Sequence, residues 1–253
     1  MKPCRNDGLV ENCRNVRQAG VKISIYDMDR TITRGGSWGP WLMFWLRREA
    51  PWRVLLLPLL ALAMAGYGLG MIDRGQLKAL GHRLLMGRRV ARARIAAATE
   101  AYADKVMAHR VFPGALAAIS ADRAAGAMLV LATASNQFYV DAIARRLGFH
   151  AVLATPSRWD GDWLLWRLGG ANCYGVAKDA RVAAWLAGLG IDKPAFTFTS
   201  DHESDLPVFE RALLNGGAVV VANPSPGMRA IADQRHWPNV DWGVSDRSLW
   251  ERA

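Results

Sequence analysis

The chain has 253 residues, of which 51% are hydrophobic, and its 32 basic and 22 acidic side chains leave a net charge of +10. That length and apolar content fit one large domain, or a core with a smaller inserted one, and exclude a wholly disordered chain. The cysteines, Cys4, Cys13 and Cys173, show no CxxC spacing. This argues against a disulfide-stapled secreted scaffold and against a zinc ribbon.

The positive charge would attract nucleic acid, anionic lipid or phosphorylated substrates. Arginines gather on both sides of one apolar stretch, at positions 47, 48, 53 and 74 and again at 83, 88, 89, 92 and 94. A basic flank beside an apolar segment favours an anionic membrane surface over a DNA groove. No nucleic-acid partner is therefore expected.

Residues 1–20 are polar and contain no apolar signal region, so they are predicted to form a tail, and a cytoplasmic location is expected. Short apolar runs of strand length follow at residues 21–26, 127–132, 194–199 and 217–222. Helical patterns lie at residues 115–125, 138–147, 176–189 and 206–214, and residues 161–168 could form a hairpin arm. Alternating strands and helices predict an α/β fold with a doubly wound parallel sheet.

Residues 37–110 break this alternation, because they show only helix-like patterns. We predict a helical cap there, inserted into a core made of residues 21–36 and 111–253. Within the cap, residues 54–72 carry no charge and are long enough to cross a bilayer. Pro58 and several glycines interrupt that stretch, and a single span would separate Asp27 from the rest of the core. The segment could instead form a re-entrant hairpin, lie in the membrane interface, or be buried in the cap.

The first strand ends in Asp27-Met28-Asp29-Arg30-Thr31. Two carboxylates at this position lie at the carboxyl edge of the sheet, where open α/β sheets bind ligands. Mg²⁺ would relieve their repulsion, since it prefers hard oxygen ligands. Taken alone, the motif could equally be a solvated turn.

Three further strand ends carry polar groups. Thr133, Ala134 and Ser135 could cradle a phosphate, although Ser135 or Asn136 could simply cap a helix. Lys178 lies in the first turn of a helix, where a bound anion would favour it, although an exposed lysine is the simpler interpretation. Asp201 and Asp205 follow another strand, with helix capping as the alternative, and His202 is expected to be solvated.

In this order, the four elements resemble the motifs of the haloacid dehalogenase superfamily of phosphohydrolases. The resemblance implies that Asp27 is the nucleophile and Asp29 the general acid and base. It also implies that Thr31 supports the turn, that Thr133 and Ala134 bind phosphate, and that Lys178 is the fixed cation. Mg²⁺ would be bound by Asp27, the backbone carbonyl of Asp29, and Asp201, with Asp205 nearby.

The helical insert resembles the C1-cap branch that includes phosphoserine phosphatase. Gly36 stands where those enzymes have a glutamate that reads the substrate amine. The apolar, basic-flanked cap is similar to the phosphatidylglycerophosphatase C type. We therefore expect a Mg²⁺-dependent phosphatase that acts on a lipid phosphate at the inner face of the cytoplasmic membrane. A soluble phosphatase of the phosphoserine type is the alternative, and the sequence predicts no oligomeric state.

Overall fold

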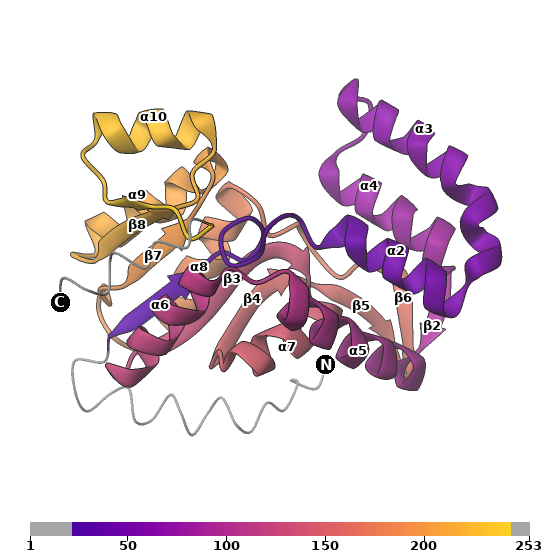
Figure 1. Cartoon of the computed structure of the whole chain (residues 1–253), viewed down its shortest axis with the longest axis horizontal. Coiled ribbons are helices and arrows are strands. Elements are labelled where there is room, and N and C mark those ends of the chain that lie inside the picture. The colour runs from indigo at the N-terminus through magenta and orange to yellow at the C-terminus, as the bar shows by residue number, and fades with distance from the viewer. Residues whose placement is uncertain (1–21, 244–253) are drawn as a thin grey trace.

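The computed structural model describes residues 22–243, so the predicted tail and Val21 lie outside the described residues. Its main sheet has six strands in the order β4-β3-β1-β7-β8-β9, and every neighbouring pair is parallel. This confirms the predicted doubly wound α/β fold (Figure 1). The strands span Ile23–Tyr26 (β1), Met128–Asn136 (β3), Ala151–Thr155 (β4), Thr197–Ser200 (β7), Ala218–Ala222 (β8) and Asn239–Val240 (β9).

Helices cover both faces of this sheet because its central strands are apolar on both sides. In β1, Tyr26 packs in one buried cluster, whereas Ile23 and Ile25 pack in the other. The first cluster includes α6 (Pro113–Ala124) and α7 (Gln137–Leu147). The second includes α8 (Val176–Gly188), α9 (Leu206–Leu214) and α10 (Pro226–Gln234). The fully apolar strand segments follow from this double coverage.

The central strand β1 lies between β3 and β7, which leave it in opposite directions along the sheet. The carboxyl ends of these three strands therefore meet at the topological switch point, where α/β proteins bind ligands. Strands β4 and β9 and helix α10 were not predicted, and β3 continues past the predicted end at residue 132 to Asn136.

Residues 37–110 contain helices α2 (Trp38–Glu49), α3 (Leu57–Gly68), α4 (Arg74–Gly81) and α5 (Arg92–His109). A 3₁₀ helix, Pro51–Leu56, precedes α3, and a π-helical turn, His82–Met86, follows α4. The prediction of a purely helical insert is wrong, because strand β2 (Arg89–Ala91) also lies there. It pairs antiparallel with β6 (Trp163–Leu168), which in turn pairs with β5 (Ser157–Asp160). A three-residue strand is too short to show the alternation that marks strands in a sequence.

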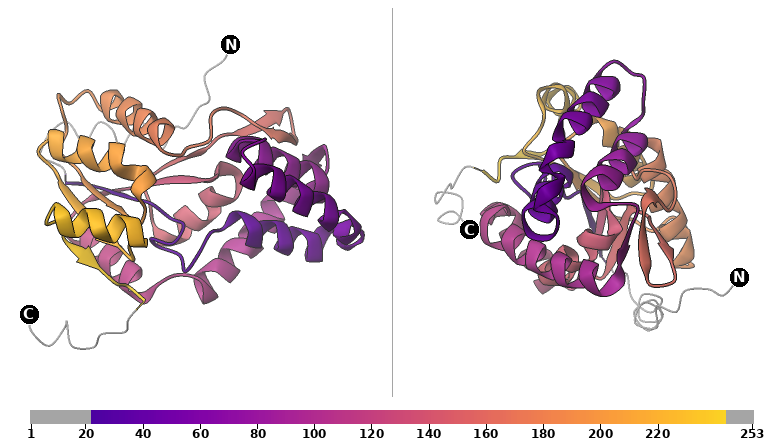
Figure 2. Two further views of the ribbon diagram at one scale, coloured as in Figure 1. Left: turned by 90° about the horizontal axis from the view of Figure 1, so that it is seen from above. Right: turned by 90° about the vertical axis from the view of Figure 1, so that its right-hand side faces the viewer.

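The uncharged segment forms a protruding hairpin rather than one straight helix. Helix α3 ends at Gly68, the chain turns back through Gly70 in the left-handed region, and α4 begins behind a capping box of Asp73 and Gln76. The stretch Pro51–Gly68 is long and apolar enough to cross a membrane, yet only 6% of it is buried. That exposure contradicts burial in the cap. We call residues 51–71, which form the first arm of this hairpin and the start of its turn, the α3 hairpin. It lies at the end of the molecule farthest from β8 and β9 (Figures 1 and 2).

Candidate active site

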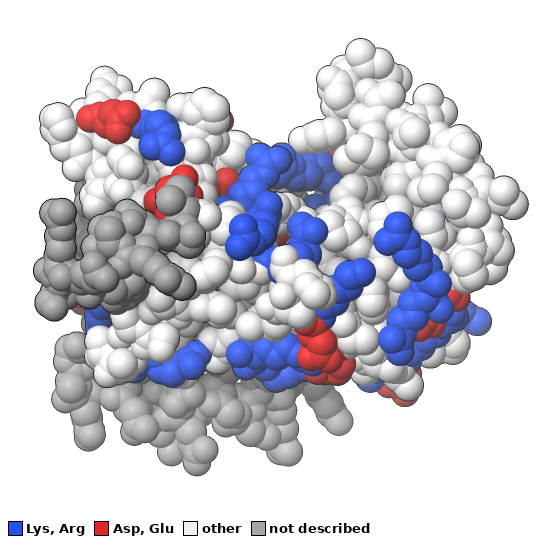
Figure 3. All heavy atoms as spheres, viewed as in Figure 1, with Lys and Arg blue, Asp and Glu red and all other residues white. Residues whose placement is uncertain are grey.

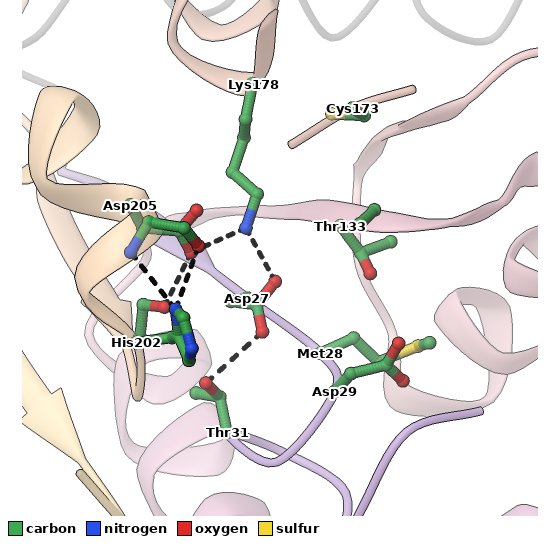
Figure 4. Close-up of polar contacts among 12 residues, drawn as sticks. Asp27, Met28, Asp29, Thr31, Thr133, Cys173, Lys178, His202 and Asp205 are labelled. Carbon is green, nitrogen blue, oxygen red and sulfur yellow. Dashed lines mark hydrogen bonds and ion pairs between the residues drawn. The ribbon is translucent and has the colours of Figure 1, made fainter. Parts of the chain in front are cut away.

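Lys178 connects two carboxylates that come from different strand ends. Its Nζ lies 2.8 Å from Oδ1 of Asp27 and 2.6 Å from Oδ2 of Asp205 (Figure 4). Ser200, the last residue of β7, also donates a hydrogen bond to Asp205 Oδ2 at 2.7 Å. All three charged side chains are buried, so the alternative that Lys178 is an exposed surface lysine is wrong.

Thr31 connects the carboxyl end of β1 to the carboxyl end of β7. Its hydroxyl oxygen lies 3.3 Å from Oδ2 of Asp27 and 3.1 Å from Oδ1 of Asp201. A hydroxyl has one proton to donate, so it serves one carboxylate at a time. The contact nevertheless places the two carboxylates, 174 positions apart in the sequence, on either side of one oxygen atom.

The loop after β1 is held by its own backbone. The amides of Ile32 and Thr33 donate to the carbonyl of Met28 at 3.0 and 2.9 Å. This turn needs a left-handed residue, and Arg30 supplies it with a φ of 67°. Asn223, beyond β8, donates to the carbonyls of Arg30 and Thr31 and so fixes the turn from outside.

Burial dominates the electrostatics of the site. It raises the pKa of Asp27 to about 8, against the opposing pull of Lys178. It also raises the pKa of Asp201 to about 6, although the hydrogen bond from Thr31 acts the other way. Burial alone would lower the pKa of Lys178, but Asp205 and Asp27 outweigh it and raise that pKa above its usual range. The site thus holds more negative charge than Lys178 neutralises.

Asp29 is held apart from this network by Ser135. The Ser135 hydroxyl donates to Oδ2 of Asp29 at 2.7 Å and lies 2.6 Å from the hydroxyl of Ser37. Asn136 occupies the first position before α7 but makes no side-chain capping bond. The helix-cap alternative for Ser135 and Asn136 is therefore wrong, and Ser135 instead orients the Asp29 carboxylate.

The β3 end carries the predicted phosphate loop. Thr133 is buried, and its hydroxyl accepts a hydrogen bond from the amide of Ser135 at 3.1 Å. The carbonyl of Ala134 accepts from Nζ of Lys78 at 2.5 Å and from the Thr155 hydroxyl at 2.6 Å. Lys78 belongs to α4, and burial lowers its pKa to about 8. It connects the insert to the end of β3, a role that no motif in its helix indicates.

One cavity of about 240 Å³ collects nearly all the predicted residues. Of the residues to which the resemblance assigns a role, Thr31 alone does not line it, since it lies beneath the carboxylates. His202, expected to be solvated, is half-buried and also lines the cavity. The predicted residues in the lining are Asp27, Asp29, Thr133, Ala134, Lys178, Asp201 and Asp205.

The donors at this edge fit a hard divalent cation. Asp27 and Asp201 are buried carboxylates that lie on either side of one hydroxyl, and burial raises the pKa of both. One oxygen of Asp29 and one of Asp205 are buried without a hydrogen-bond partner among the described residues. Within residues 22–243, no group of three or more acidic, histidine or cysteine side chains forms a ready metal cage. Two carboxylates supplemented by a backbone carbonyl and water suit Mg²⁺, which keeps part of its water shell.

Comparisons with known proteins agree with this geometry. The family model of haloacid dehalogenase-like hydrolases matches residues 25–210. The phosphoserine phosphatase SerB1 of Mycobacterium tuberculosis is 27% identical over 177 residues, which cover 70% of this chain and 55% of that protein. The chain thus spans little more than half the length of this curated relative.

Solved structures show the same fold. A Bordetella pertussis protein of unknown function superposes with a TM-score of 0.76 at 26% identity, over 88% of this chain and 99% of the other. A phosphoserine phosphatase with an analogue of its phospho-aspartyl intermediate gives a TM-score of 0.57 at 15% identity, over 91% and 96% of the two chains.

The chain belongs to the haloacid dehalogenase-like hydrolase family. This match confirms the predicted superfamily, and phosphoserine phosphatases are among the proteins that the chain is similar to. Magnesium and an aspartyl-phosphate intermediate are general features of such phosphatases.

Proposed function

We propose that the protein is a Mg²⁺-dependent phosphomonoesterase that forms an aspartyl-phosphate on Asp27. An oxygen of Asp27 forms a bond to phosphorus as the ester P–O bond breaks, and Asp29 gives its proton to the leaving alkoxide. Asp29 then accepts a proton from water as that water attacks phosphorus, which releases phosphate and the free Asp27 carboxylate. Lys178 holds Asp27 in place throughout and offsets its repulsion of the incoming phosphate.

The metal would be held by the carboxylates of Asp27 and Asp201 and the backbone carbonyl of Asp29, with Asp205 behind them. When bound, Mg²⁺ supplies positive charge that lets an anionic carboxylate approach an anionic phosphate. The two buried carboxylates on either side of Thr31 and the buried, unpartnered oxygens of Asp29 and Asp205 support this assignment.

The substrate we propose is a membrane-lipid phosphate such as phosphatidylglycerophosphate, taken at the cytoplasmic face of an anionic membrane. The observation that carries this is the α3 hairpin. Its large apolar side chains are exposed, among them Leu55 at 80%, Leu69 at 77% and Met71 at 76%. A contiguous apolar surface of this kind marks an interaction site.

Basic residues beside the α3 hairpin support an anionic partner. Arg47, Arg83, Arg88 and Arg89 are exposed, and none pairs with an acidic residue in the described part of the chain. Each free arginine near an anionic bilayer contributes about 1 kcal/mol to binding. Arg53 packs over the ring of Trp52, 4.5 Å from its centroid, at the boundary between the apolar and basic surfaces.

A soluble phosphatase of the phosphoserine type is the second candidate, favoured by the similarity to SerB1. Gly36 counts against it. This residue lines the cavity at the position where the resemblance places an amine-reading glutamate. A Cβ at Gly36 would meet no atom within 4 Å, so the space for a larger side chain exists and is not used.

Phosphate release from phosphatidylglycerophosphate in anionic vesicles, measured beside release from O-phosphoserine, tests the proposal. We expect the lipid to have the higher kcat/KM and EDTA to abolish both activities. A strong preference for phosphoserine would overturn the lipid assignment, and activity that resists EDTA would overturn the metal assignment.

A further inference from the structure

Two arginines line the active-site cavity without a carboxylate partner. Arg30 comes from the loop after β1, and Arg74 is the first residue of α4. Neither makes a salt bridge with any residue in the range 22–243. Lys178, the remaining lysine or arginine in the lining, is already shared between Asp27 and Asp205. Figure 3 shows basic side chains gathered in the hollow between the two lobes of the molecule.

The guanidinium of Arg74 is held at the mouth of the cavity by two aromatic residues. It packs over the ring of Tyr174, 4.0 Å from the centroid, and its Nε donates to the hydroxyl of Tyr67 at 3.4 Å. Arg74 and Tyr174 also line a second, outer groove of about 540 Å³. They therefore stand between the reaction centre and the groove, and Tyr67 connects them to the α3 hairpin.

Arg30 occupies a backbone position that glycine would fill with less strain. Its φ of 67° lies in the left-handed region, which costs a residue with a Cβ free energy. The side chain is nevertheless exposed at the cavity, and among the described residues it makes no salt bridge or side-chain hydrogen bond that would repay that cost. Strain kept at such a site points to a function for the side chain.

The acidic residues of the cavity leave no partner for a cationic substrate group. Asp27, Asp29, Asp201 and Asp205 all belong to the reaction centre, and they are all the carboxylates in the lining. A phosphomonoester needs one set of positive charges, which Lys178 and the metal site provide. Two additional arginines suit a second anion on the same substrate.

We infer that Arg30 and Arg74 form a subsite for a second anionic group, a carboxylate or a phosphodiester, carried on the alcohol side of the phosphomonoester. This rests on the proposed phosphatase function and specifies its substrate class. The subsite disfavours substrates in which an ammonium lies beside that second anion.

Three soluble compounds separate the effect of a second anion from the effect of a neighbouring ammonium. Glycerol 3-phosphate has no second anion, 3-phosphoglycerate adds a carboxylate, and O-phosphoserine adds both a carboxylate and an amine. We expect kcat/KM for 3-phosphoglycerate to exceed that for each of the others by about tenfold, the value of one charge-assisted hydrogen bond. Dihexanoyl phosphatidylglycerophosphate, used as a monomer, tests the phosphodiester as the source of the second charge.

Substitutions locate the subsite. Arg74→Gln should reduce the preference for 3-phosphoglycerate over glycerol 3-phosphate to less than about threefold. Arg30→Gly should reduce it similarly without lowering the melting temperature, because glycine relaxes the left-handed turn. Arg167→Gln is the matched control, since Arg167 packs over Trp166 at 4.9 Å but does not line the cavity. It should keep the wild-type preference.

Binding measured without turnover separates this inference from the proposed function. Calorimetric titration of the Asp27→Asn protein with 3-phosphoglycerate and glycerol 3-phosphate should show the same preference, and the additional Arg74→Gln change should remove it. Equal affinity for both compounds, or a preference that survives Arg74→Gln and Arg30→Gly, overturns the subsite. Absence of turnover of all compounds by the wild type, with selective binding intact, overturns the phosphatase proposal instead.

Discussion

The reaction centre buries charged side chains, whereas the α3 hairpin exposes large apolar ones. Proteins seldom tolerate either arrangement. At the end of β1, Asp27, Lys178 and Asp205 are charged and buried. In the α3 hairpin, leucine, methionine and tryptophan side chains are apolar and exposed. Each arrangement costs free energy in isolation. The buried charges at the reaction centre partner one another. The exposed apolar side chains of the α3 hairpin have no partner in the described part of the chain.

The two regions should therefore respond differently to substitution. Substitutions at the reaction centre should impair catalysis, and loss of the shared cation Lys178 should also destabilise the fold. Substitutions in the α3 hairpin should leave folding unchanged and alter only what the surface binds.

Asp27→Asn should lower kcat by about a thousandfold or more, since an amide cannot form the covalent intermediate. The fold should persist, because Lys178 retains Asp205 as its partner. Hydrolysis of p-nitrophenyl phosphate and circular dichroism measure the two effects. More than a tenth of wild-type activity would show that Asp27 is not the nucleophile.

Lys178→Met should destabilise the protein by about 3–5 kcal/mol, because two buried carboxylates lose their cation. Lys22→Met is the matched control: its pair with Asp122 is just as short, at 2.7 Å, but the lysine is half exposed. That control should cost less than about 1 kcal/mol. Urea denaturation measures both, and equal losses would contradict the electrostatic account of the site.

Replacing Leu55, Leu62 and Leu69 together by serine should weaken binding to anionic vesicles by about a hundredfold, since each leucine gives up over 1 kcal/mol of apolar burial. The melting temperature should not change, because all three side chains are exposed. Vesicle co-sedimentation measures the binding. Serine at Leu116, Leu213 and Leu214, which are exposed on α6 and α9, is the control and should bind like the wild type. Equal binding by both triple variants would remove the α3 hairpin as the membrane contact.

His82, on the inner side of the insert, should make the stability of the protein sensitive to acid. Burial and the nearby Lys78 lower the pKa of His82 to about 4. The unfolded chain therefore takes up this proton at higher pH than the folded one, so stability is unaffected above about pH 6.5 and falls as the pH drops to 4. The loss should reach about 3 kcal/mol. Urea midpoints across this range should fall less steeply for His82→Phe, and an unchanged slope would exclude His82 as a source of acid sensitivity.

The sequence predicted that the cavity residues would come together, because they follow strand ends. Parallel strands align their carboxyl ends, so residues such as Asp27 and Asp201 can be expected to meet without knowledge of any side-chain contact. The same regularity located helices α6 to α9 to within two residues.

Other features depend on contacts between distant segments and left no local signal. Strand β2 has three residues and exists because β6 lies beside it. Lys78 sits in an ordinary amphipathic helix, and only the folded chain brings it to Ala134. Ser135 matched a helix cap in its local pattern, but the proximity of Asp29 gives its hydroxyl a different partner.

Mass spectrometry of an acid-quenched reaction tests the covalent role of Asp27 most directly. With p-nitrophenyl phosphate and Mg²⁺, the account predicts a phosphoryl adduct on the peptide that contains Asp27, and its loss in the Asp27→Asn protein. A phosphoryl group on any other residue, or turnover by wild type with no adduct at all, would contradict it.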